Sequence, residues 1–149
     1  MGNLSSPSHK MMVTKKYAFE DIINCVIVSS MNWTVIFHDA FDAEFSAFSS
    51  EVQDAFLAKA GLLKIFGPQL GRPHVDTLND SKHTNMKELR FDAAGGVWRV
   101  AFAFDTLRQA IILVAGDKSG GSEKRFYRSL IATADKRLDD HLAQQKKGS

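Results

Sequence analysis

The sequence predicts an α+β fold, an antiparallel sheet with helices packed on one face and an open basic face. Three stretches between residues 86 and 117 alternate apolar and polar side chains or are apolar throughout, which is typical of strands joined by hairpins. Two stretches before them and one after them repeat apolar residues at helical spacing. The expected order of elements is therefore β-α-α-β-β-β-α.

Composition favours a single globular domain. The chain has 149 residues, a formal net charge of +2 and one cysteine, Cys25, so it can bury a core and cannot form an internal disulfide. A lone cysteine suits a reducing compartment, and we expect a cytoplasmic protein. The apolar run at residues 22–28 is too short to span a bilayer, so no membrane partner is expected.

Charge and composition also divide the chain. Residues 39–54 carry acidic and no basic side chains, whereas basic side chains gather between residues 87 and 128. We expect residues 1–30 to be a partly disordered N-terminal extension and residues 31–145 to form the domain. Residues 146–149 are expected to be a polar tail.

The first half of the domain begins with a strand. Residues 33–38 are rich in β-forming side chains and are the expected strand. Phe41, Phe45 and Phe48 recur at spacings of four and three, which predicts a short amphipathic helix. Asp39 is the expected cap of this helix.

A second helix is expected next. Residues 50–53 form a capping-box pattern that opens it, and Gly67-Pro68 ends it. Residues 69–85 are polar and are expected to be a long loop that either binds a ligand or is solvated.

Three strands follow, at residues 86–91, 97–104 and 110–115. The last of them is apolar on both faces and should be central. The final helix is expected to begin after Ser122 and to run to about Gln145.

Alternation places three charged side chains together. The large apolar residues of the first two of these strands fall on one side, so Glu88, Arg90 and Arg99 project from the other side. The third strand delivers Lys118 to the end of the sheet. From the pattern alone, a cross-strand ion pair on a solvated sheet is the competing interpretation of Glu88 and its arginines.

Fixed cations on a sheet face suit a polyanion, because arginine binds phosphate bidentately. Cutting RNA without a metal ion requires a base for the 2′-hydroxyl, cations around phosphorus and an acid for the 5′-oxygen. Glu88 is the candidate base, and Arg90, Arg99 and Lys118 are the candidate cations. Tyr127, Lys124 or Arg125 can supply an acid or a phosphate contact. Further candidate RNA-binding residues are Arg72, Lys82 and Lys87. The histidines show no metal-ligand spacing, so no metal or other cofactor is expected.

A run of motifs resembles a known family. It comprises L-G-R-P-H-V-D-T-L, S-K-H-T-N-M-K-E-L-R, W-R-V-A-F-A-F-D, A-I-I-L-V-A-G-D-K-S-G and F-Y-R-S-L-I-A-T-A-D-K-R in this order. Residues 31–143 thereby resemble the phage-associated HigB-like branch of the RelE/ParE toxin superfamily. The resemblance implies the RelE-like fold and the toxin of a type II toxin–antitoxin pair, which enters the ribosomal A site and cuts mRNA without a metal ion. The implied partners are the ribosome, mRNA and a cognate helix-turn-helix antitoxin, with a toxin–antitoxin hetero-oligomer possible.

The resemblance also implies site residues. Basic residues that surround the scissile phosphate in the family correspond by position to Arg90, Arg99 and Lys118, and the family's aromatic residue corresponds to Tyr127. Some relatives carry a lysine where this chain has Glu88, so the identity of the base stays open. Two alternatives also stay open: a ParE-like inhibitor of DNA gyrase, and a non-catalytic phage-borne binding module.

Overall fold

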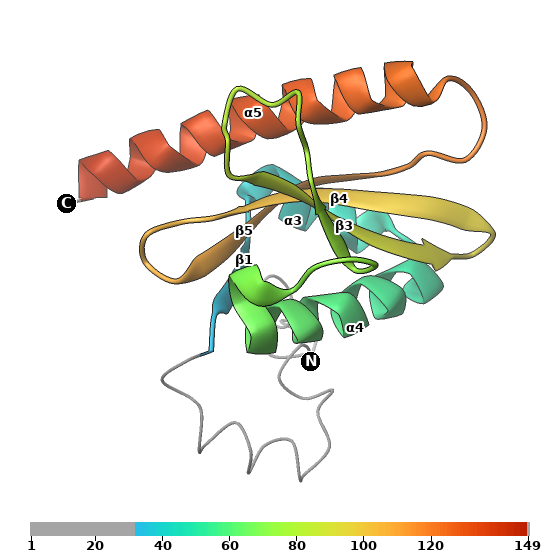
Figure 1. Ribbon diagram of the computed structural model, residues 1–149, viewed down its shortest axis with the longest axis horizontal. Coiled ribbons are helices and arrows are strands. Elements are labelled where there is room, and N and C mark those ends of the chain that lie inside the picture. Colours follow the sequence, from blue (N-terminus) through green and yellow to red (C-terminus); the bar gives the residue numbers. More distant parts are fainter. Residues whose placement is uncertain (1–31, 149) are drawn as a thin grey trace, which may run out of the picture.

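A five-stranded sheet forms the middle layer of the molecule, with helices on both sides (Figure 1). The computed structural model describes residues 32–148, so the expected extension at residues 1–30 lies outside the described residues. The elements in chain order are β1 (Thr34–Phe37), α3 (Asp39–Ala47), α4 (Ser50–Phe66), β2 (Val75–Thr77), β3 (Met86–Ala93), β4 (Gly96–Phe104), β5 (Gln109–Asp117) and α5 (Glu123–Gly148). The predicted α+β class is confirmed. The helix α5 extends beyond its expected end at Gln145.

The strand order is β1-β5-β4-β3-β2. Strands β3, β4 and β5 form the predicted antiparallel meander, and β5 lies inside the sheet as expected. The prediction of a wholly antiparallel sheet is wrong at β1, which pairs with β5 in parallel. The reason is the order in which the strands are added to the sheet. After β1, helices α3 and α4 carry the chain to the opposite edge of the sheet, and the strands then return one by one until β5 lies beside β1 and runs in the same direction.

Both faces of the sheet are covered. On one face, α3 and α4 bury a phenylalanine-rich core that includes Phe41, Phe45 and Phe56. On the other face, α5 buries Leu130 and Ala134 in a second core that also contains residues of β3, β4 and β5. The prediction that helices pack on one face and leave the other open is therefore wrong. Ala101 and Ala103 of β4 are fully buried in this second core, and such small side chains let a helix lie close to the sheet.

Helix α5 begins as predicted. The Ser122 hydroxyl accepts a hydrogen bond from the backbone N–H of Arg125 at 3.2 Å, which satisfies one of the free donors at the helix start. The other two caps differ from expectation by one residue. His38 Nδ1 caps α3 by accepting from the Ala40 N–H at 3.0 Å, and the Ser49 hydroxyl caps α4.

The loop before β3 is fixed at both ends. Its short strand β2 pairs with β3, with Asp76 opposite Glu88. Residues 78–85 then reach α5, where Ser81 donates a hydrogen bond to Asp135 at 2.5 Å and His83 contacts Asp139 at 2.8 Å. The expected polar arm is therefore held against α5. Among the described helices, none is long and apolar enough to cross a membrane.

Candidate functional site

The predicted strand faces bring the three charged side chains together. Arg90 and Arg99 are directly opposite each other on β3 and β4, and Glu88 lies two residues along β3 on the same face. This face is not open, because α5 lies over it. Glu88 is 4% exposed and the Arg99 side chain is 11% exposed, so the site is a cleft between β3 and α5 rather than a free surface.

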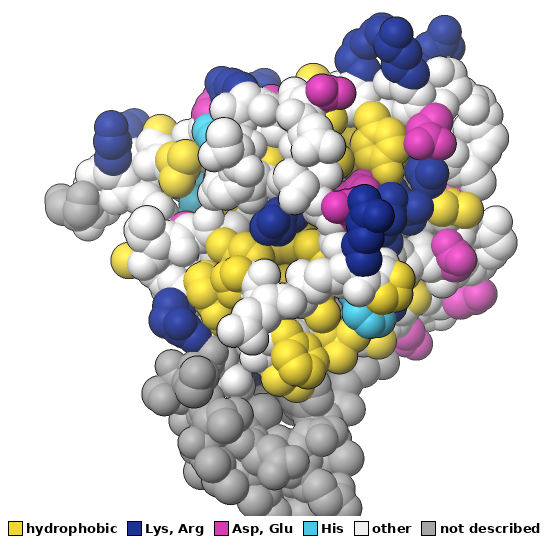
Figure 2. Space-filling model, in the orientation of Figure 1, with side chains coloured by type: hydrophobic (Ala, Val, Ile, Leu, Met, Phe, Trp, Pro, Cys, Tyr) yellow, Lys and Arg dark blue, Asp and Glu magenta, His cyan; other side chains and the backbone are white. Residues whose placement is uncertain are grey.

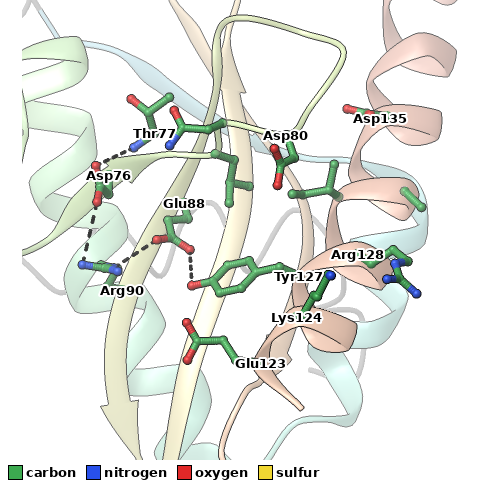
Figure 3. Close-up of a pocket in the computed structure, with 14 residues that line it drawn as sticks. Asp76, Thr77, Asp80, Glu88, Arg90, Glu123, Lys124, Tyr127, Arg128 and Asp135 are labelled. Atoms are coloured by element: carbon green, nitrogen blue, oxygen red, sulfur yellow. Dashed lines mark hydrogen bonds and ion pairs between the residues drawn. The ribbon is translucent and has the colours of Figure 1, made fainter.

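The hydroxyl of Tyr127, on α5, points at the Glu88 carboxylate, which in turn lies beside Arg90 (Figure 3). This hydroxyl donates to Glu88 Oε1 at 2.8 Å and accepts a hydrogen bond from Arg99 Nε at 3.2 Å. Arg90 Nε lies 3.1 Å from Glu88 Oε2, but this buried N–H has no hydrogen-bond partner, so the contact is an ion pair without hydrogen-bond alignment. We call Glu88, Arg90, Arg99 and Tyr127 the central network.

The surroundings of Tyr127 favour the protonated form of its phenol. Burial raises the pKa of Tyr127, and the hydrogen bond and the negative charge of Glu88 raise it further. Arg99 lowers the pKa of Tyr127 but does not reverse the shift. At neutral pH the Tyr127 hydroxyl is therefore a hydrogen-bond donor, while the two guanidinium groups beside it remain cations.

A cavity of about 930 Å³ opens between β2, β3 and α5, and we call it the main cleft. Four predicted site residues line it: Glu88, Arg90, Lys124 and Tyr127. It also contains carboxylates and a cation that the sequence reasoning missed: Asp76, Asp80, Glu123, Asp135 and Arg128. Carboxylates therefore outnumber cations in the main cleft. Within residues 32–148, no three His, Cys, Asp or Glu side chains are grouped so that they could hold a metal ion.

The remaining predicted residues are more scattered. Lys118 forms an ion pair with Glu123 at 3.2 Å near the start of α5, and Arg72 binds Asp76 at 2.8 Å. Lys82 pairs with Asp139, and Lys87 lies on the opposite side of β3 from Glu88. Arg125 is exposed and lines none of the cavities described here. The molecular face drawn in Figure 2 shows a group of Lys and Arg side chains with Asp or Glu side chains beside it.

One sequence signal could have found part of the missed set. Lys124, Arg128 and Asp135 share one side of α5 with Tyr127, at spacings that a helix brings onto one stripe. Asp76 gave no such signal, because it belongs to a three-residue strand within a polar loop.

Fold and site together define a small α+β domain whose last helix covers a network of arginine, glutamate and tyrosine on the sheet. The model of the family described as phage-derived Gp49-like protein (DUF891) matches residues 43–139, and this chain belongs to that family. The predicted HigB-like relationship is confirmed by two relatives from Mycobacterium tuberculosis.

These relatives are named as candidate toxins, HigB3 and HigB2. The chain is 45% identical to HigB3 over 104 residues, which span 70% of this chain and 89% of that protein. It is 38% identical to HigB2 over 120 residues, which span 80% of this chain but 59% of that longer protein. No solved structure matches the chain significantly.

Proposed function

We propose that this chain is the toxin of a type II toxin–antitoxin pair and acts as a metal-independent, ribosome-dependent mRNA endoribonuclease. Two lines of evidence support this proposal. The chain is homologous to proteins named as HigB toxins. Its central network combines a carboxylate, a phenol and two guanidinium groups, which are the groups that RNA transesterification requires.

In the proposed reaction, the 2′-oxygen forms a bond to phosphorus and the bond between phosphorus and the 5′-oxygen breaks. The products are a 2′,3′-cyclic phosphate and a 5′-hydroxyl end. One proton leaves the 2′-hydroxyl and one reaches the 5′-oxygen, so the step balances without a co-reactant. We assign Glu88 as the acceptor of the first proton and Tyr127 as the donor of the second, because both line the main cleft.

The hydrogen bond between Glu88 and Tyr127 makes this assignment self-consistent. The charge of Glu88 is one cause of the raised pKa of Tyr127. When Glu88 is protonated this cause disappears, while Arg99 continues to lower the pKa of Tyr127. Tyr127 therefore becomes a better acid when the 5′-oxygen needs a proton. The proton on Glu88 can then pass to the phenolate across the 2.8 Å contact.

The cations have separate roles in this proposal. Arg90 and Arg99 stabilise the charge that develops on the non-bridging phosphate oxygens, because both are held in place by Glu88 and Tyr127. Lys118 leaves Glu123 to become a third phosphate contact, and Lys124 binds RNA at the mouth of the main cleft. We assign Arg72, Lys82, Lys87 and Arg125, which do not line this cleft, to flanking RNA or to the ribosome.

The proposed partner is a cognate helix-turn-helix antitoxin that blocks the toxin in a hetero-oligomer. This part of the proposal follows from the homology to proteins named as HigB toxins. A small helix-turn-helix protein encoded beside this chain, and its co-purification with it, would support the pairing.

The observation that carries the proposal is the joint contact of Tyr127 with Glu88 and Arg99. Primer extension on an mRNA under translation tests it. Wild type should cut within codons, Arg99→Ala should leave the mRNA intact, and the control Lys136→Ala, at an exposed position of α5 outside the main cleft, should retain the cleavage. Intact mRNA with accumulating cleaved complexes of DNA and gyrase would favour a ParE-like inhibitor instead.

A further inference from the structure

A second cleft lies on the other side of Arg90. Its volume is about 540 Å³, and its charged lining residues are Lys59, Arg90, Asp92 and Arg99. Ala55, Ala58, Pro73 and Phe91 complete its walls. Three cations and one carboxylate line the second cleft, whereas carboxylates outnumber cations in the main cleft. Glu88 lies 3.1 Å from Arg90 and 3.9 Å from Arg99, so it offsets part of their charge but not that of Lys59. By charge, the second cleft is the better place for an anion.

Lys59 enters this cleft from α4 and is already oriented. Its ammonium group lies 2.7 Å from His74 Nδ1 and can donate a hydrogen bond to that ring nitrogen. An ammonium group has three donors, so two remain for another ligand. Among the described residues, no carboxylate lies within ion-pair distance of Lys59. Its charge is therefore available to a bound anion.

Arg99 retains unused hydrogen-bonding capacity. Arg90 Nε is instead buried beside Glu88 Oε2 at 3.1 Å, so Arg90 contributes its charge to this cleft rather than that N–H. Arg99 uses Nε for Tyr127 and Nη1 for the carbonyl oxygen of Trp98, which leaves Nη2 free to donate to a ligand. A phosphate oxygen near Nη2 of Arg99 would gain a charge-assisted hydrogen bond.

Arg90 belongs to both clefts, and Arg99 joins the second cleft to Tyr127. We propose that the second cleft binds a backbone phosphate of single-stranded RNA next to the scissile phosphate, with Lys59 as a further RNA-binding residue. This inference rests on the proposed function for the identity of the polyanion. A linear chain fits better than a free nucleotide, because Arg90 lines both clefts and neighbouring phosphates of one strand would each have a cleft of their own.

The test measures how salt weakens binding of a short single-stranded oligodeoxynucleotide, which has no 2′-hydroxyl and cannot be cut by this reaction. Each phosphate contact contributes about 0.7 to the slope of log affinity against log salt concentration for single strands. Lys59→Gln should lower this slope by about 0.7, and Lys59→Arg should restore it. Lys136→Gln removes an exposed charge from α5 outside both clefts and should leave the slope unchanged.

Two results would overturn the inference: no binding of the oligodeoxynucleotide by wild type at low salt, or equal slopes for Lys59→Gln and wild type. Failure of the nuclease proposal has a different signature. If the slope depends on Lys59 but the protein leaves translated mRNA intact, the proposed phosphate site stands and the proposed nuclease reaction is refuted.

Discussion

Replacing Tyr127 with phenylalanine removes one oxygen atom from the centre of the network. The hydroxyl donates to Glu88 at 2.8 Å and accepts from Arg99 at 3.2 Å, so both contacts disappear together. The ring itself can stay in place, because it packs edge-on against Phe126 with centroids 5.2 Å apart. The substitution therefore tests the hydroxyl rather than the packing of α5.

The expected loss of stability is modest. Leaving a buried acceptor without its donor costs about 1–3 kcal/mol. Glu88 keeps its ion pair with Arg90 at 3.1 Å, and Tyr127 is partly exposed, so we expect about 1–2 kcal/mol. Since a domain of this kind is stable by about 5–15 kcal/mol, Tyr127→Phe should remain folded, with a lower midpoint in urea.

The expected loss of activity is much larger. Removing a general acid slows a reaction by about 10²–10⁴-fold, which corresponds to about 2.7–5.4 kcal/mol of transition-state stabilisation. The assay is single-turnover cleavage of mRNA on stalled ribosomes at saturating toxin. Tyr17, the other tyrosine of the chain, provides the matched control Tyr17→Phe. Wild-type cleavage by Tyr127→Phe, together with the expected drop in its urea midpoint, would refute the proposed acid and leave Tyr127 a structural role.

Three further predictions follow, two from the central network and one from the end of α4. In a Tyr17→Phe background, Glu88→Gln should lower the pKa of Tyr127, because it removes the charge that raises it; an unchanged phenol titration by ultraviolet absorbance would contradict this. Because the pKa of Tyr127 is higher in the folded than in the unfolded protein, Tyr127 contributes stability that is fully present below its pKa in the unfolded chain, about 10, and is lost as pH rises through its pKa in the folded protein. The urea midpoint of wild type should therefore fall more in alkali than that of Tyr127→Phe. Gly67→Ala should destabilise the fold by about 2–3 kcal/mol in urea, because Gly67 has φ +55° and an added Cβ would lie 2.4 Å from the Trp33 ring; a wild-type midpoint would show that α4 can end differently.

Strand periodicity was the strongest signal in the sequence. The alternation along β3 and β4 correctly predicted that Glu88, Arg90 and Arg99 share a face, because side-chain direction in a strand depends only on position. The chain order of helices and strands also followed from local patterns, apart from β2. These features depend on residues near one another in the sequence, which is why they were predictable.

The covering of that face by α5 was missed. The signal was present in β5, whose side chains are apolar on both faces, since such a strand requires an apolar layer on each side. By strand alternation Ala101 and Ala103 lie on the same side of β4 as Arg99. In the structure they are the fully buried floor under α5.

Other parts of the site could not be read from local patterns. The three residues of β2 are held by backbone hydrogen bonds to β3, which any sequence can make. Lys59 is an ordinary partly exposed lysine in the α4 sequence, and only the packing of α4 beside β3 brings it near Arg90. Such neighbours are set by tertiary contacts and have no sequence period.

The chemistry of the cut ends tests the central claim most directly. Wild-type protein is added to a purified translation system, and the mRNA fragments are separated and their termini identified. Proton transfer through Glu88 and Tyr127 predicts a 2′,3′-cyclic phosphate on one fragment and a 5′-hydroxyl on the other. Full-length mRNA after complete arrest of translation, or fragments with 5′-phosphate ends, would contradict the account.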